Sequence, residues 1–255
     1  LIIADTEHDT GGAAGCAVAD STDGSLNQAL AANGNTVTAS KSSSATVTDA
    51  ADLADVTVMN ASTTSKASAT VVAGSLGSAR LSTRTRSHLD AAQGVLSACE
   101  ASTTATGGLQ TLFRVARPGW LRISITTTST GPAQSQFLVA PELGDSGMFS
   151  LSMMIDSTDT RRVYLPAGGY NAIVLQQTVL ATPSGADAPI TDAASTLVAD
   201  LVFTPGGAAP GPATGAGRTY LSPAAAISCT PRTLSNRWKA KASAVTQARL
   251  LVNGR

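Results

Sequence analysis

Charged residues are scarce in this chain. Lys, Arg, Asp and Glu make up 13% of its 255 residues, about half the usual share, and Ser, Thr, Ala and Gly take their place. Aromatic residues amount to only 4%, and the first of them is Phe113. Because Thr and Val favour strands, this composition is typical of an extracellular or cell-surface β protein rather than of a cytoplasmic enzyme.

Motifs of nucleophilic and phosphate chemistry are also missing. The sequence has no Gly-x-Ser-x-Gly or Gly-x-Cys-x-Gly turn, and neither of its two histidines, His8 and His88, lies in a motif with a nucleophile. Its Gly-rich stretches lack the Lys-Ser/Thr of a phosphate loop. We therefore expect a protein that is not an enzyme and has no cofactor, with calcium as the single exception considered below.

Long apolar runs are absent, so we expect no membrane insertion. The short basic segment Arg80-Leu-Ser-Thr-Arg-Thr-Arg86 has no aromatic residue between its arginines. It is therefore interpreted as a solvated face, and no nucleic-acid partner is expected.

Cysteine is rare, and Cys16, Cys99 and Cys229 lie far apart without the paired spacing of a zinc site. One disulfide fits an extracellular protein. The pair Cys99–Cys229 would bracket the predicted sandwich, although nothing in the sequence selects it over the other pairings.

The clearest strand pattern runs from Leu112 to Pro205, where apolar and polar residues alternate and Pro or Gly marks the turns. The predicted fold class is mainly β: an antiparallel jelly-roll or immunoglobulin-like sandwich over residues 109–205. The step in aromatic content sets the expected domain boundary, so residues 1–108 form a separate N-terminal region.

Two segments of this stretch carry a family resemblance. Residues 119–125 read Gly-Trp-Leu-Arg-Ile-Ser-Ile, and residues 165–174 read Leu-Pro-Ala-Gly-Gly-Tyr-Asn-Ala-Ile-Val. They resemble the Gly-x-Leu-x-Ile/Val strand and the Leu-Pro-Ala-Gly-x-Tyr-x-Val hairpin of bacterial pre-peptidase C-terminal domains. The resemblance implies a small extracellular jelly-roll sandwich. The acidic calcium cluster frequent in that family is not evident here.

Residues 1–108 fit two architectures. Predicted helices at 23–34 and 48–54 between short strands would make a small α/β region, similar to the start of a flavodoxin-like or amidotransferase-like fold. Alternatively, Gly24-Ser-Leu-Asn-Gln-Ala-Leu30 resembles the entry segment of bacterial surface β-helix proteins. A further helix is predicted over residues 87–98.

The C-terminal part begins with a Gly/Pro/Ala linker at residues 206–217. Residues 218–255 are predicted to form strands. Their ending, Ala-Val-Thr-Gln-Ala-Arg-Leu-Leu-Val-Asn-Gly-Arg, resembles the closing hairpin of bacterial immunoglobulin-like modules, of which about half is present.

Two groups of residues are candidate binding sites. Carboxylates near the N-terminus could supply oxygen ligands to calcium, although a solvated polar loop is the simpler interpretation. Large aromatic rings could stack on sugars, although strand alternation buries at least two of them. The acids are Asp5, Glu7, Asp9, Asp20 and Asp23, and the rings are Trp120, Tyr164, Tyr170 and Trp238.

Charge is unevenly distributed although the net charge is zero. Residues 1–60 are acidic and residues 206–255 are basic, which could steer contacts between copies of the chain. We expect a non-catalytic extracellular structural or adhesive protein that self-associates, through edge strands and its oppositely charged ends, or binds other surface proteins. The alternative is an accessory module of a secreted hydrolase that binds polysaccharide or calcium.

Overall fold

The computed structural model describes residues 1–12, 16–19, 21–50, 52–53, 56–91, 99–141, 151–154, 158–182, 191–207, 227–229 and 232–234. The chain forms two units, Leu1–Gly207 and Ala208–Arg255. In the second unit, β14 (Ile227–Cys229) pairs with β15 (Arg232–Leu234) in an antiparallel hairpin.

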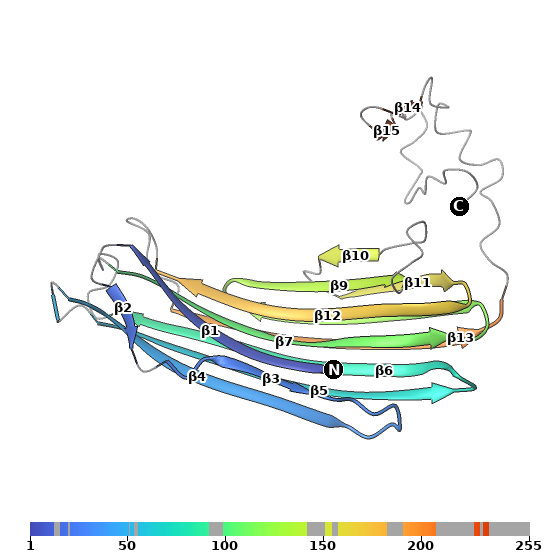
Figure 1. The fold of residues 1–255 in the computed structure, drawn as a ribbon, viewed down its shortest axis with the longest axis horizontal. Coiled ribbons are helices and arrows are strands. Elements are labelled where there is room, and N and C mark those ends of the chain that lie inside the picture. The colour runs from blue at the N-terminus through green and yellow to red at the C-terminus, as the bar shows by residue number, and fades with distance from the viewer. Residues whose placement is uncertain are drawn as a thin grey trace. The chain divides into compact units, whose positions relative to one another are not determined.

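The first unit is a sandwich of two antiparallel sheets built from long strands (Figure 1). The six-stranded sheet has the order β10-β9-β12-β7-β1-β3, and the seven-stranded sheet has the order β11-β8-β13-β6-β5-β4-β2. The strands are β1 (Ile2–Gly12), β2 (Cys16–Ala19), β3 (Gly24–Gln28), β4 (Val37–Asp49), β5 (Val56–Val72), β6 (Ser75–Ala91), β7 (Cys99–Val115), β8 (Gly119–Thr130), β9 (Ala133–Pro141), β10 (Leu151–Met154), β11 (Asp159–Leu165), β12 (Gly168–Ala181) and β13 (Asp192–Pro205).

The alternating sequence explains the length of these strands. β5, β6 and β7 have 17 residues each, which at about 3.4 Å per residue is a length of about 58 Å. Along them, inward positions are mainly Ala, Leu, Ser or Thr, and outward positions are mainly Thr, Ser, Arg and Lys. A two-residue turn, with positive φ at Ala73 and Gly74, joins β5 to β6 and suits the twist of a hairpin.

Of the two alternatives for residues 1–108, the β-rich one is confirmed and the α/β one is wrong, because the described residues contain no helix. Part of the first predicted helix is β3, which pairs with β1. The predicted helix at residues 48–54 overlaps the last residues of β4, and the one at residues 87–98 overlaps the last residues of β6. The apolar spacing in these short segments fits a helix or a strand equally, and pairing with a long neighbour decides for the strand. The strands of both sheets are antiparallel, unlike the rungs of a β-helix.

The chain does not divide at residue 108, which lies inside β7. β1 and β3 belong to the same sheet as β9 and β12, while β4, β5 and β6 belong to the same sheet as β8 and β13. The change in aromatic content near residue 108 therefore falls within one sandwich and does not mark a domain boundary. The observed division after Gly207 falls within the predicted linker, whose residues 208–217 lie outside the described residues.

The interior has two different halves. Around the start of β8 and β12 it is an apolar cluster with large side chains such as Phe113, Leu121 and Phe137. Toward the other end it is built mainly from Thr, Ser and Ala. The sheets approach closely at Gly107, where an added Cβ would overlap the hydroxyl groups of Thr63 and Thr83.

The predicted disulfide Cys99–Cys229 is wrong, because Cys99 is bonded to Cys16. The pairing of β1 with β7 ends at Gly12 opposite Cys99. The chain then returns as β2 on the other sheet, which brings the Cα atoms of Cys16 and Cys99 to 5.6 Å. The bond thus ties the two sheets together beside a small apolar cluster containing Val47 and Met59.

Candidate binding surface

The predicted calcium ligands do not converge. Asp5, Glu7 and Asp9 alternate with buried residues along β1 and point outward in a row, with steps of about 6.8 Å. The fourth acid, Asp20, lies outside the described residues. No group of three or more His, Cys, Asp or Glu side chains within the described ranges could hold a metal ion.

Asp23, the last of these acids, has a structural partner instead. Its Oδ2 accepts a hydrogen bond from the backbone N–H of His8 at 3.1 Å, and its Oδ1 lies 3.5 Å from His8 Nε2. The buried His8 ring also contacts Ser43 Oγ at 2.9 Å. Burial lowers the pKa of His8, and the charge of Asp23 opposes that shift. His8 therefore bridges the two sheets: it lies on β1 and Ser43 lies on β4.

The four predicted aromatic residues do not form one platform. Tyr170 is only 3% exposed; its ring stacks on Phe113 at 5.6 Å and its hydroxyl donates to the carbonyl of Pro166. Tyr170 is thus a core residue. Trp238 lies outside the described residues. Trp120 is half-buried and projects from the outer face of the seven-stranded sheet.

Trp120 has one neighbour from the predicted sugar platform, Tyr164. Tyr164 is directly opposite Trp120 where β11 pairs with β8, and their rings meet edge to face at 5.4 Å. The guanidinium of Arg162 lies 5.5 Å from the centre of the Trp120 ring. Because Tyr164 lies between two buried residues, Val163 and Leu165, alternation predicts that its side chain points outward. Its position opposite Trp120 follows only from the register in which β11 pairs with β8.

The same outer face carries most of the cations of the first unit, and we call it the basic face. Its arginines and lysine project from β11, β8, β6 and β5, where they alternate with buried residues along each strand. Arg80 pairs with Asp200 at 3.6 Å. The cations are Lys66, Arg80, Arg84, Arg86, Arg122 and Arg162, and they outnumber the outward acids Asp90, Asp192 and Asp200.

A polar groove of about 560 Å³ crosses this face over β4, β5, β6 and β13. Small side chains such as Ser42, Ser62 and Ala194 form part of its lining, together with Arg86 and His88. His88 Nδ1 lies 2.9 Å from Asp192 Oδ1, and this contact orients the imidazole. Hydroxyl, amide, imidazole and guanidinium groups in a shallow groove can hydrogen-bond a ligand with many hydroxyl groups and pair with its carboxylates.

Comparisons with known proteins identify no family for this chain. No family model matches the chain, and no curated protein matches it. Among solved structures, one match is described as "Structural basis for the promiscuous specificity of the carbohydrate-binding modules from the beta-sandwich super family". It shares 12% identity, covers 66% of this chain and 75% of that chain, and has a TM-score of 0.26. The class of protein follows from the two sheets themselves, which make it an all-β antiparallel sandwich. No helix in the described part of the chain is long and apolar enough to span a membrane.

Proposed function

We propose that this protein is a non-catalytic extracellular adhesive protein that binds an acidic polysaccharide through the basic face. The observation that carries the proposal is the excess of cations on the basic face: Arg86 lines the groove, and the Trp120–Tyr164 pair lies on the same sheet. The other cations, Lys66, Arg80, Arg84, Arg122 and Arg162, are spread along the same face.

The residue types favour a hydroxylated anion. Guanidinium groups form paired hydrogen bonds with carboxylates, and an indole ring stacks on the apolar face of a sugar ring. Arg84 and Arg86 have no ion-pair partner among the described residues. Their charges are therefore available to a ligand.

The shape of the surface favours a polymer over a compact ligand. The groove is shallow and crosses four strands, and the aromatic pair lies on β8 and β11, several strands away from β5 and β4 in the same sheet. An extended chain can contact both regions at once, so weak contacts at each would add.

An extracellular location agrees with the covalent chemistry. The Cys16–Cys99 disulfide joins the two sheets, and disulfides persist mainly in oxidising compartments outside the cytosol. A low share of charged side chains and many hydroxyl groups on both sheets also fit this location.

Affinity electrophoresis in gels containing polygalacturonate, with dextran as the neutral comparison, tests the proposal. We expect retardation by polygalacturonate only, weakened by salt because exposed charges are screened. The double variant Arg84→Ala/Arg86→Ala should lose most of the retardation and Trp120→Ala part of it. Arg114→Ala, on the other sheet, should change nothing.

Equal retardation by dextran and polygalacturonate, or none by either, would contradict the proposal. We expect EDTA to have no effect, because the acids of β1 form a row rather than a cluster. Loss of binding on adding EDTA would point to the calcium-dependent alternative.

A further inference from the structure

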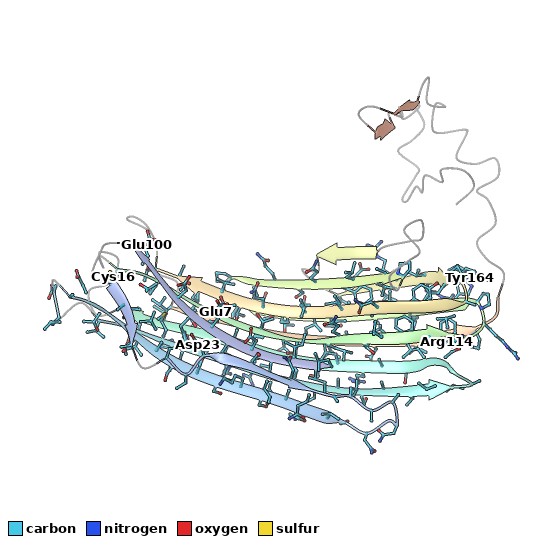
Figure 2. The ribbon with its side chains drawn as sticks, viewed as in Figure 1. Glu7, Cys16, Asp23, Glu100, Arg114 and Tyr164 are labelled. Carbon is cyan, nitrogen blue, oxygen red and sulfur yellow. A yellow bond between two sulfur atoms is a disulfide. The ribbon has the colours of Figure 1, made fainter. Side chains whose placement is uncertain are left out.

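The outer face of the six-stranded sheet carries a row of acids, which we call the acidic ladder. Asp5, Glu7 and Asp9 point outward from β1 at every second residue. The next outward position is Gly11, and its partner on β7 is Glu100, whose carboxylate lies against Gly11. The ladder therefore has four acids in successive steps. Glu7 and Glu100 are labelled in Figure 2.

The basic face carries a corresponding row, which we call the basic ladder. Arg80, Arg84 and Arg86 point outward from β6, and the outward position between the first two is Ser82. The partner of Ser82 on β5 is Lys66. Lys66 therefore completes a row of four cations in the same way that Glu100 completes the row of acids.

The two ladders have the same repeat. Each step is two residues of an antiparallel strand, or about 6.8 Å, so four charges extend over about 20 Å in both rows. None of the four acids forms an ion pair with a described residue, and Arg80 is the only cation of the basic ladder that does.

Apolar side chains adjoin both rows. Ile3 continues the acidic ladder toward the N-terminus, and Leu175 lies on the same face two strands away, across Gly108. Val198 and Val202 point outward from β13, next to β6. These side chains are half-buried, and they could exclude water at the centre of an interface.

We propose that a second copy of this chain docks its acidic ladder on the basic ladder of the first. The two ladders lie on opposite sheets of one sandwich, so each copy can use both at once. Such a contact joins two different surfaces and produces open-ended stacks rather than closed dimers. Contact between two like faces would place charges of one sign together and is disfavoured.

This contact uses the basic face that the proposed function assigns to polysaccharide, but the acidic ladder serves only the contact between copies. Polymer and second copy therefore compete for the basic ladder. Changes in the acidic ladder separate the two ideas, because they remove assembly and leave the residues of the basic face unchanged.

The experiment is sedimentation velocity of the full chain between 20 and 500 mM NaCl (about 20 to 5 Å of screening length). We expect masses above the monomer at low salt and dissociation at high salt. The acidic-ladder variant Asp5→Lys/Glu7→Lys/Asp9→Lys and the basic-ladder variant Lys66→Glu/Arg80→Glu/Arg84→Glu/Arg86→Glu should each associate at least tenfold more weakly. Arg117→Glu, an exposed charge reversal in the turn between β7 and β8, should associate like the wild type.

Mixing the two ladder variants is the decisive test of the contact between copies. One variant has two basic faces and the other has two acidic faces, so the mixture should assemble although neither does so alone. A wild-type chain that stays monomeric at low salt overturns the proposal, as does an acidic-ladder variant that assembles normally. Circular dichroism checks that each variant is folded, and the salt dependence of the wild type tests the contact without any substitution.

Discussion

The two halves of the sandwich interior are held together in different ways. In one half, buried Phe, Leu, Ile and Val side chains from both sheets form a single cluster. In the other, the inward positions of long strands are mainly Thr, Ser and Ala, and several hydroxyl groups there have no hydrogen-bond partner among the described residues. The first half, the apolar half, gains stability from burial of large side chains. The second, the threonine half, depends on strand pairing, the disulfide and a few polar contacts.

Loss of the disulfide should produce the largest effect, in the threonine half. Cys16 and Cys99 are 83 residues apart, and closing a loop of that length stabilises a protein by about 4–5 kcal/mol in the chain-entropy model. We expect Cys16→Ser/Cys99→Ser to lower the free energy of unfolding by an amount of this order, measured by urea denaturation. Cys229→Ser is the control and should leave the unfolding of Leu1–Gly207 unchanged. Equal stability of the double variant and the wild type would show that strand pairing alone holds this half.

Truncation in the apolar half should have an effect nearly as large. Phe137 is fully buried between the sheets, and Phe→Ala in a core costs about 3–5 kcal/mol. We expect Phe137→Ala to lower the urea midpoint accordingly. Leu112, which is 64% exposed, supplies the matched control Leu112→Ala, with a change below about 0.5 kcal/mol. Similar losses for both variants would contradict the described core.

Removal of a single hydroxyl group from the threonine half should change stability in a direction set by its partner. Thr83 and Thr85 are both buried on β6, but Thr83 Oγ1 bonds to Ser65 Oγ at 2.8 Å, whereas Thr85 Oγ1 has no partner among the described residues. We expect Thr85→Val to stabilise the protein by about 1 kcal/mol and Thr83→Val to destabilise it by about 1 kcal/mol. Chemical denaturation measures both. Changes of the same sign would mean that the hydroxyl groups of this half do not differ in hydrogen bonding.

Acid should weaken the contact that His8 makes between the sheets. Burial lowers the folded-state pKa of His8, so the unfolded chain binds the proton more tightly. This contribution to stability is present above the unfolded-state pKa, near 6.5, and falls as the pH drops from there toward the folded-state pKa. We expect a lower thermal midpoint at pH 5 than at pH 7, with a smaller difference in His8→Gln.

His88, which is more exposed and paired with Asp192, provides the control His88→Gln. A pH dependence removed by His88→Gln instead of His8→Gln would assign the effect to the basic face.

The apolar half was the more predictable half. Phe113, Leu121, Ile123, Val163 and Leu165 alternate with polar neighbours, and the structure buries all five. Large apolar side chains at every second position show which face of a strand is buried. The threonine half gave no such signal, because Ala, Thr and Ser are nearly as acceptable outside a core as inside one.

Site residues were predictable only one strand at a time. The alternation in β1 shows that Asp5, Glu7 and Asp9 share one face, and this is enough to argue against a compact metal cluster. It does not show that Glu100 continues their row or that Lys66 fills the position beside Ser82. Both facts depend on which residues of separate strands lie opposite each other.

Alternation is enough to predict the fold class and which side chains point inward in the aromatic region, because it is a local property with a period of two residues. The register, the Cys16–Cys99 bond, the Trp120–Tyr164 pair and the two ladders are not local properties of this kind. Each of these joins strands far apart in the chain, and the energy that selects such pairings comes from contacts that do not exist until the two sheets have formed.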